Sequence, residues 1–478
     1  MTITDDQPAA DHLPSPVLLT VLAAGGGTRM RSRVPKPLHA VAGVPMVQRV
    51  LQAGAAVDPH QTIVVINPTM REQLERASWI GPAVLVEQPE TKGTGDAVAR
   101  ALGNARHEAI AVVLYADHPL LTGEVVRRLV MGARQSAARV TVLSCLVEDA
   151  AGYGRIERNE VGAVSRIVER ADDEVAARQG VTEINSGMMA LDVAWAREAL
   201  TRVEPSGTTG ELYLTDLVEL AVRGHRSGEP WPVASVQASP EVALGINDRQ
   251  QLREAEAVLW ERKRREVLAA GVSLIGADTI FIDGDVEIGQ DTLIFPFTIL
   301  RAGTRIGGDC RIGPHATLDQ TVLGDGVTVQ ASTLTRVRVG DGADIGPYAH
   351  LRAGTVIGEG AHIGNYAEIK NATIGTRSKV GHFSYVGDAR VGDGANIGAG
   401  VVTANFDGTA KHRTDIGDGA FIGSNTVLRA PVRVGVEAVT GAGSVVTKDV
   451  PDGATAVGVP ARIIKRGTQA DDSPGGKT

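Results

Sequence analysis

The segment VGDGADIGPYAHLRAGTVIGEGAHIGNYAEIK (residues 339–370) carries the strongest pattern in this 478-residue chain. An aliphatic residue stands at every sixth position, and a glycine follows most of these residues. The aliphatic positions within the segment are Val339, Ile345, Leu351, Ile357, Ile363 and Ile369. A six-residue period predicts a parallel β-helix, in which inward-pointing aliphatic side chains stack from one coil to the next.

The same period extends over the second half of the chain, from about residue 272. It returns in Ile374, Val380 and Val386, in Val391 and Ile397, and in Ile416 and Ile422. Three hexads make one coil, and stacked strands lie about 4.8 Å apart, so we expect roughly ten coils in a prism about 50 Å long. The flat faces and edges of such a prism need cover, which favours closed packing of several copies.

A polar loop, ANFDGTAKHRTD (404–415), interrupts the hexads and marks a candidate site. Residues one coil apart lie side by side in a hexad stack, so residues of successive coils can converge on one groove. The residues that we expect to converge are Lys370, His382, Tyr385 and Asn396. The alternative is that His382 is only an exposed histidine of the repeat.

The first half of the chain alternates apolar runs such as VLLTVLAA (17–24) with amphipathic segments. This alternation predicts an α/β domain whose mostly parallel sheet is covered on both faces. Ligands of such sheets bind at the carboxyl ends of the strands. The three glycines, Arg29 and Lys36 of LAAGGGTRMRSRVPKPLH (22–39) follow the first run, where backbone N–H groups and cations suit a phosphate. The alternative is an ordinary strand–helix turn with solvated cations.

Two common phosphate motifs are excluded in this turn. Met30 stands where the dinucleotide fingerprint has its third glycine, and no Gly-Lys-Ser/Thr follows as in a P-loop. Asp117 follows another apolar run and is either a metal ligand or a helix cap, whereas Asn247 alone is more typical of a helix N-cap. The pair together favours Mg²⁺, which takes oxygen ligands and commonly has one or two from protein.

Composition and charge limit the functional classes. The chain has 48 Lys and Arg against 56 Asp and Glu, a net charge of −8, which argues against nucleic acid or an anionic membrane as the main partner. The acidic start lacks an apolar signal region, and the two cysteines, Cys145 and Cys310, form no disulfide framework, so we expect a cytoplasmic protein. We expect domains at 1–249 and 271–478, a linker helix over 250–270, and a disordered tail from about residue 467.

Ordered motifs across the first half resemble those of sugar-phosphate nucleotidyltransferases. The glycine-rich segment and the blocks EQPETKGTGDAV, LYADHPLL, GYGRI, IVE, EINSGMM, GELYLTD and GINDRQQL (87–252) resemble the bifunctional family of N-acetylglucosamine-1-phosphate uridylyltransferases and glucosamine-1-phosphate N-acetyltransferases. The blocks LRAGTV, IGNYAEIK and VGHFSYVGD (351–388) resemble the acetyltransferase half of that family. The resemblance implies a Rossmann-like nucleotidyltransferase domain, a left-handed β-helix, a homotrimer and a place in bacterial cell-wall synthesis.

The resemblance also implies two reactions and their residues. Acetyl-CoA would acetylate glucosamine-1-phosphate, and Mg²⁺-dependent transfer from UTP would then give UDP-N-acetylglucosamine and pyrophosphate. The residues implied for the nucleotide site are Leu22, Ala23, Ala24 and Gly25 at the uracil and phosphates, Gln88, Gly93 and Thr94 at the base edge, Arg29 and Lys36 at the triphosphate, Tyr115 and Ala116 beside them, Gly154, Glu169 and Asn185 at the amino-sugar, and Asp117 and Asn247 at the metal. Those implied for acetyl transfer are His382 as general base, Arg352 and Lys370 at the sugar phosphate, Tyr385 and Asn396 at the sugar hydroxyls, and Asn405, Phe406, Lys411, Ser424 and Ala442 at acetyl-CoA.

Three departures from the family pattern leave points open. His118 stands where the family has a small residue, either as a neutral neighbour or in contact with phosphate or metal. Phe406 replaces a tyrosine. The end GVPARIIKRG resembles single-function hexapeptide acyltransferases, so Arg462, Lys465 or Arg466 is a candidate for the CoA phosphates. Two alternatives stay open as well: a nucleotidyltransferase whose β-helix only oligomerises or regulates, and a non-catalytic assembly protein.

Overall fold

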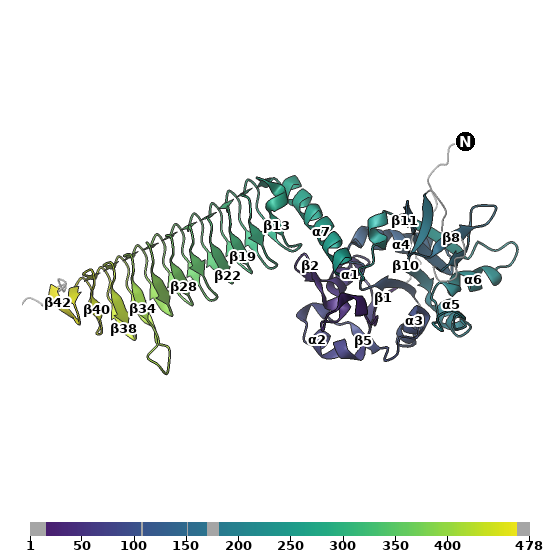
Figure 1. Cartoon of the computed structure of the whole chain (residues 1–478), viewed down its shortest axis with the longest axis horizontal. Coiled ribbons are helices and arrows are strands. Elements are labelled where there is room, and N and C mark those ends of the chain that lie inside the picture. Colours follow the sequence, from purple (N-terminus) through teal and green to yellow (C-terminus); the bar gives the residue numbers. More distant parts are fainter. Residues whose placement is uncertain (1–15, 107–108, 151, 170–180, 466–478) are drawn as a thin grey trace, which may run out of the picture. The chain divides into compact units, whose positions relative to one another are not determined.

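The computed structural model describes residues 16–106, 109–150, 152–169 and 181–465. The chain divides into two compact units, Met1–Leu259 and Trp260–Thr478. The linker helix expected over 250–270 is α7 (Arg249–Ala269), and the division falls inside it (Figure 1). The expected domain boundaries stay predictions, and the expected disordered tail lies outside the described residues. None of the described helices is both long enough and apolar enough to span a membrane.

The first unit is built on a largely parallel sheet with the strand order β11-β7-β10-β6-β1-β4-β5. Strand β10 runs antiparallel to both of its neighbours, β6 and β7, and it also pairs with β8 of a short β8–β9 hairpin. The strands are β1 (Val17–Ala23), β4 (Gln61–Ile66), β5 (Val84–Glu87), β6 (Ile110–Tyr115), β7 (Val140–Val147), β8 (Arg155–Arg158), β9 (Val164–Val168), β10 (Thr182–Asp192) and β11 (Val233–Ala238), with a separate pair β2 (Ala40–Val41) and β3 (Val44–Pro45).

Helices cover both faces of this sheet. They are α1 (Met46–Ala55), α2 (Arg71–Glu75), α3 (Thr94–Gly103), α4 (Gly123–Ser136), α5 (Val193–Leu200) and α6 (Asp216–Arg223). Strand β1 is buried along its whole length, and its side chains alternate between two cores. Leu19 and Val21 pack in the core that contains α1 and α4, whereas Leu18 and Leu22 pack in the core that contains α3, α5 and α6. This double burial explains why the strand reads as a continuous apolar run.

The second unit is a left-handed parallel β-helix with three faces (Figure 1). The first face contains β12 (Ser273–Leu274), β15 (Leu293–Ile294), β18 (Arg311–Ile312), β21 (Thr328–Val329), β24 (Asp344–Ile345), β27 (His362–Ile363), β30 (Lys379–Val380), β33 (Asn396–Ile397), β36 (Phe421–Ile422), β39 (Val439–Thr440), β41 (Thr455–Gly458) and β42 (Ala461–Lys465). The last two strands form an antiparallel hairpin.

The other two faces follow the same stacking. The second contains β13 (Phe281–Ile282), β16 (Ile299–Leu300), β19 (Thr317–Asp319), β22 (Thr333–Thr335), β25 (His350–Leu351), β28 (Glu368–Lys370), β31 (Tyr385–Gly387), β34 (Val402–Ala404), β37 (Val427–Arg429) and β40 (Val445–Val446). The third contains β14 (Glu287–Ile288), β17 (Arg305–Ile306), β20 (Val322–Leu323), β23 (Arg338–Val339), β26 (Val356–Ile357), β29 (Thr373–Ile374), β32 (Ala389–Val391), β35 (Thr414–Ile416) and β38 (Val432–Val434). The 10 strands of the second face confirm the expected number of coils.

The hexad aliphatics form the single core of this β-helix. Ile345, Ile363 and Val380 lie in register on consecutive coils, and all three side chains are buried. The β-helix core also contains Val267 from the last turns of α7. Because Val267 packs with the residues of the first coil, α7 caps the end of the prism where stacking begins.

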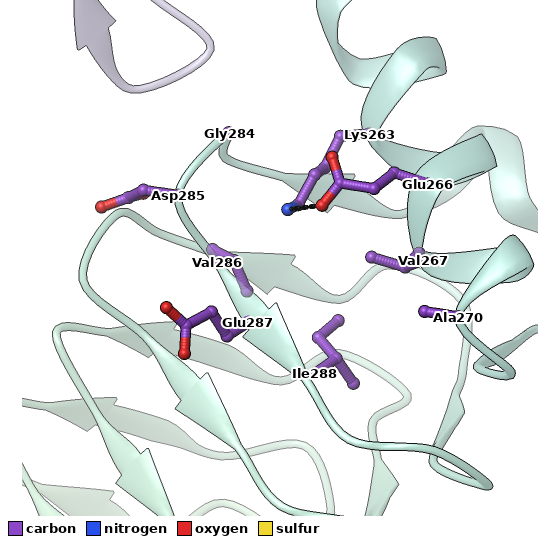
Figure 2. Close-up of a pocket in the computed structure, with 9 residues that line it drawn as sticks. All are labelled: Lys263, Glu266, Val267, Ala270, Gly284, Asp285, Val286, Glu287 and Ile288. Atoms are coloured by element: carbon purple, nitrogen blue, oxygen red, sulfur yellow. Dashed lines mark hydrogen bonds and ion pairs between the residues drawn. The ribbon is translucent and has the colours of Figure 1, made fainter. Parts of the chain in front are cut away.

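A groove of about 450 Å³ lies between α7 and the first coil (Figure 2). Lys263 is nearly fully buried there, and its Nζ contacts Glu266 Oε1 at 2.7 Å. The other lining residues include Asp285 and Glu287, and neither predicted site contributes to the groove. Since Glu266 compensates the charge of Lys263, we interpret this groove as part of the helix cap.

Candidate active sites

The first candidate site lies where β1 and β6 end. These strands are parallel neighbours, so their carboxyl ends meet at one edge, and the Ala116 N–H donates to the Leu22 carbonyl at 3.0 Å. Leu22, Ala23 and Ala24 have buried side chains, so they can present only backbone to a ligand. Gly27 has a φ of 58°, and a Cβ there would lie 2.6 Å from the Lys36 Cβ. Glycine at this position therefore lets Lys36 approach the turn.

Lys36 joins the two residues predicted to bind metal. Its Nζ lies 2.6 Å from Asp117 Oδ2 and 3.0 Å from Asn247 Oδ1, and Arg29 Nη2 donates to the same amide oxygen at 2.9 Å. Burial alone would raise the pKa of Asp117, but contacts with His118 and Lys36 hold it far below its usual value. Asp117 is therefore an ionised carboxylate, with the Lys36 ammonium at one oxygen and a ring nitrogen of His118 at the other.

This oxygen pair fits a divalent cation. The Lys36 ammonium already lies between Asp117 Oδ2 and Asn247 Oδ1, as a stand-in positive charge. Mg²⁺ prefers oxygen ligands and commonly takes one or two from protein, completing its shell with water and phosphate. Among the described residues, no group of three or more His, Cys, Asp or Glu side chains could hold a metal, so an all-protein cage is not built there.

A pocket of about 530 Å³ opens beside this cluster. It brings together the predicted residues Arg29, Thr94, Tyr115, Asp117, Gly154, Glu169, Asn185 and Asn247. The remaining predicted residues, Leu22, Ala23, Ala24, Gly25, Lys36, Gln88, Gly93 and Ala116, are not among its lining residues. Gln88 instead donates to the Gly93 carbonyl at 3.1 Å and to Asp96 at 2.8 Å, which stabilises the turn that begins α3.

The three residues predicted to bind the amino-sugar lie close together in the pocket. The Asn185 N–H donates to the Gly154 carbonyl at 2.8 Å, and a Cβ on Gly154 would lie 3.4 Å from Glu169 Oε2. Thr215 donates to Glu169 Oε1 at 2.7 Å and also lines the pocket. Sequence reasoning gave no role to Thr215, Tyr213 or Glu211, although the block GELYLTD contains all three.

The second candidate site lies on a corner of the β-helix. His382 is two residues past the end of β30, and its Nδ1 contacts Asn365 Oδ1 one coil earlier. An amide oxygen only accepts hydrogen bonds, so Nδ1 carries the proton and Nε2 is available as a base. Asn365 was missed in the sequence, although it stands 17 positions before His382, which is about one coil.

A group of cations lies near the carboxyl ends of β25 and β28. Arg352 Nη1 donates to Glu368 Oε1 at 2.8 Å, on the next coil. The neighbouring Lys411, and to a smaller degree Arg352, lower the pKa of Lys370. Lys411 was predicted at acetyl-CoA, but the fold brings it beside Lys370. A bound anion would reduce the electrostatic repulsion between these neighbouring cations.

The other predicted sugar contacts are distributed over two faces. Tyr385 begins β31, next to Glu368 of β28 on the second face. Asn396 begins β33 on the first face, where it pairs with Lys379. Convergence of Lys370, His382, Tyr385 and Asn396 in one groove therefore does not follow from stacking on a single face.

Two of the predicted acetyl-CoA residues, Ser424 and Ala442, continue the same corner. The corner column consists of His382, Ala399, Ser424 and Ala442, each two residues past a strand of the first face. Hydrogen bonds join its coils: Gly400 N–H donates to the His382 carbonyl at 2.9 Å, and Gly443 N–H to the Ser424 carbonyl at 2.8 Å. In the polar loop, Asn405 Nδ2 donates to Asp388, and the Phe406 side chain is exposed.

The β41–β42 hairpin follows the corner column along the prism. Strand β41 pairs with β39, and Arg462 lies opposite Val457 in the hairpin. Arg462 and Lys465 are exposed, whereas Arg466 lies outside the described residues. Arg462 therefore stands beyond the end of the corner column that is farthest from His382.

Comparisons with known proteins agree with both halves. Residues 19–272 match the MobA-like NTP transferase domain. Residues 285–320 and 336–371 match the bacterial transferase hexapeptide (six repeats), and residues 413–448 match the hexapeptide repeat of succinyl-transferase. The matched regions have the order expected from the motifs.

Similar curated proteins cover nearly the whole chain. The chain is 46% identical over 442 residues to a bifunctional protein GlmU of Heliobacterium modesticaldum, covering 91% of this chain and 94% of that protein. It is 41% identical over 468 residues to a bifunctional protein GlmU of Pseudarthrobacter chlorophenolicus, covering 97% and 94%. With both domain types in order and identity over this length, the chain belongs to the GlmU family of bifunctional enzymes of UDP-N-acetylglucosamine biosynthesis.

Proposed function

We propose that the corner around His382 acetylates glucosamine-1-phosphate with acetyl-CoA, and that the pocket around Asp117 then transfers uridylyl from UTP to the product. Two observations support this assignment. Asn365 leaves Nε2 of His382 free to accept a proton, and the Lys36 ammonium lies between two oxygens suited to a metal. The cytoplasm is the proposed location, since UTP and acetyl-CoA are made inside cells and both cysteines are free and buried.

In the acetyl transfer, His382 Nε2 takes a proton from the sugar ammonium. The neutral amine then attacks the thioester carbonyl, so that a C–N bond forms and the C–S bond breaks. The proton that the nitrogen loses on becoming an amide passes to the leaving thiolate, and the proton on His382 is released to solvent. An imidazole suits this step because it titrates near neutral pH. Arg352, Lys370 and Lys411 bind the sugar phosphate, which places the amine at the base.

In the uridylyl transfer, an oxygen of the sugar phosphate attacks the α-phosphorus of UTP in line. A new P–O bond forms, the bond to the β-phosphate breaks, and pyrophosphate leaves. The attacking phosphate is already anionic, so positioning and neutralisation of charge supply the catalysis and no base is needed. Arg29 and Lys36 neutralise the triphosphate, while Asp117 and Asn247 would hold Mg²⁺, which when bound neutralises phosphate charge.

A homotrimer is the proposed assembly. The aromatic ladder consists of Tyr348, Tyr366 and Phe383, at one corner of three consecutive coils. Its neighbouring rings stack at 5.3 and 5.1 Å, and each side chain is more than half exposed. Exposed apolar patches of this kind commonly mark protein interfaces. Because Phe383 follows His382 directly, cover by a neighbouring copy would also enclose the proposed base.

One assay tests both assignments. Purified full-length protein is mixed with glucosamine-1-phosphate, acetyl-CoA, UTP and Mg²⁺, and free thiol and pyrophosphate are followed separately. His382→Ala should lower thiol release about 10²–10⁴-fold but retain pyrophosphate release from added N-acetylglucosamine-1-phosphate. Asp117→Ala should do the opposite. Loss of both products in either variant, or of neither, would overturn the assignment of that residue.

A further inference from the structure

We propose that His118 is a positioning residue that makes the proposed metal site selective for a small divalent cation over a larger one. It does so by occupying one oxygen of Asp117, so that only the other oxygen faces the cation position. This inference rests on the proposed role of Asp117 as a metal ligand. It concerns a residue that departs from the family pattern, and it gives that residue a specific chemical task.

The two oxygens of the Asp117 carboxylate have different partners. Oδ1 lies 2.8 Å from His118 Nδ1, whereas Oδ2 lies 2.6 Å from Lys36 Nζ. Since an ionised carboxylate only accepts hydrogen bonds, His118 Nδ1 must carry the proton in this contact. The carboxylate therefore cannot rotate freely, and Oδ2 alone points toward the position that Lys36 fills.

The ring of His118 is held firmly in place. The side chain is only 8% exposed, and the ring centroid lies 5.7 Å from that of Tyr115. A Cβ on Gly245 would lie 3.0 Å from His118 Cε1 and 3.2 Å from Nε2. Glycine at position 245 therefore leaves the space that the ring occupies, and any larger residue would push on it.

Gly245 also orients the second proposed ligand. Its carbonyl accepts a hydrogen bond from Asn247 Nδ2 at 3.2 Å, which leaves Asn247 Oδ1 facing Lys36 and Arg29. The Asp117 carbonyl further accepts from the Ile246 N–H at 2.9 Å. Each of the two ligands therefore offers one oxygen. Gly245 contributes to both orientations, because it leaves space for the His118 ring beside Asp117 and its carbonyl binds the amide nitrogen of Asn247.

A single oxygen from each ligand favours a particular ion. Mg²⁺ requires near-octahedral geometry at about 2.0–2.1 Å and keeps several waters, whereas Ca²⁺ accepts bidentate carboxylates at about 2.3–2.6 Å. By engaging Oδ1, His118 disfavours bidentate binding by Asp117. Without the histidine, the carboxylate can rotate and present both oxygens, so the preference for Mg²⁺ over Ca²⁺ should fall.

The test measures metal preference by displacement. Mn²⁺ is bound to full-length protein saturated with the α,β-methylene analogue of UTP, and its electron paramagnetic resonance signal is followed as Mg²⁺ or Ca²⁺ displaces it. Taking the ratio of the two displacement constants cancels any contribution that the nucleotide makes equally to the binding of Mg²⁺ and of Ca²⁺. His118→Ala should lower the preference for Mg²⁺ about tenfold, the size typical of residues that orient metal ligands. His118→Asn, whose amide nitrogen can donate to Oδ1, should largely restore it.

Two further variants make every outcome decisive. Gly245→Ala keeps His118 but pushes on its ring, so it should shift the ratio in the same direction as His118→Ala. Asp117→Asn should weaken Mn²⁺ binding itself, and far-ultraviolet circular dichroism reports the folding of every variant. An unchanged ratio in both His118→Ala and Gly245→Ala, with Mn²⁺ binding lost in Asp117→Asn, would overturn this inference alone. Unchanged Mn²⁺ binding in Asp117→Asn would overturn the proposed metal ligand and this inference with it.

Discussion

Lys36 shows how one side chain serves two states of a site. In the structure its ammonium lies between Asp117 Oδ2 and Asn247 Oδ1, where it compensates a partly buried carboxylate. The same ammonium is predicted to neutralise the triphosphate. In the proposed complex with nucleotide and metal, the phosphates would offer Lys36 another partner, and the two oxygens would become available to the cation. The charge of the site would then be balanced in both states.

Asn365 should matter to acetyl transfer through His382. We expect Asn365→Ala to lower kcat about tenfold, because Nδ1 loses the acceptor that keeps the proton off Nε2. His382→Ala removes the base and should cost about 10²–10⁴-fold. Asn365→Asp retains an acceptor and should recover most of the activity. Thiol release measures the effect, and equal losses in Asn365→Ala and Asn365→Asp would contradict this role.

The pair Lys370 and Lys411 predicts a shift in pH dependence. The neighbouring Lys411 lowers the pKa of Lys370, so Lys370 loses its charge at a lower pH than an ordinary lysine as pH rises. Lys411→Met should lower kcat/KM for glucosamine-1-phosphate about tenfold at neutral pH and move its alkaline decline to higher pH. The substrate amine titrates equally with both proteins, and uridylyl transfer is the control. Alkaline limbs that coincide would contradict this interaction.

The strands of the β-helix owe their stability to the inward position of each hexad. In β26, Ile357 is buried in the core whereas its neighbour Val356 points outward and is 41% exposed. We expect Ile357→Ala to lower the free energy of unfolding by about 2–5 kcal/mol, because it leaves a cavity. Val356→Ala is the matched control and should change it by less than about 1 kcal/mol. Urea unfolding followed by circular dichroism measures both, and similar effects would contradict the assignment of faces.

The β41–β42 hairpin gives Arg462 a testable role. Five inter-strand spacings, about 24 Å, separate the coil of His382 from Arg462, a distance comparable to extended coenzyme A. Arg462→Glu should raise the KM for acetyl-CoA about tenfold or more, because a charge-assisted contact to phosphate is lost.

Two controls separate this contact from a general disturbance. S-acetylpantetheine lacks the nucleotide phosphates, so Arg462→Glu and the unaltered protein should use it equally. Arg433 is paired with Asp452 on another part of the prism, and Arg433→Glu should leave the KM for acetyl-CoA unchanged. An equal loss with both thioesters would show that Arg462 does not bind the phosphates.

For the whole molecule, the two activities should respond differently to loss of assembly. Tyr366 is the middle residue of the aromatic ladder and contacts the rings of Tyr348 and Phe383. We expect Tyr366→Glu to give monomers in sedimentation experiments and to lower acetyl transfer more than tenfold, while uridylyl transfer stays within about twofold. Tyr366→Phe keeps the ring and should remain assembled. A monomer with full acetyl transfer would separate the ladder from catalysis.

Local patterns were sufficient to predict the architecture. The hexad pattern recurs in every coil, so the stacking of Ile345 on Ile363 can be predicted from their spacing in the sequence alone. Alternating apolar and amphipathic segments likewise predicted a mostly parallel sheet. Because Asp117 follows an apolar run, it was predicted to lie at the edge of this sheet where ligands bind. These features depend on neighbours within one strand or one coil, which a sequence displays directly.

The contacts that orient the sites depend on residues far apart in the chain. Lys36 and Asn247 are 211 positions apart, yet they share a hydrogen bond. Asp117 and His118 are adjacent, but their contact depends on the space left by Gly245. Lys411 lies beside Lys370 because the polar loop folds back toward it, which the spacing of the hexads does not indicate. Sequence periodicity therefore determines which residues face inward. Packing between distant segments determines which charged groups meet, because a side chain can point only into the space that other segments leave free.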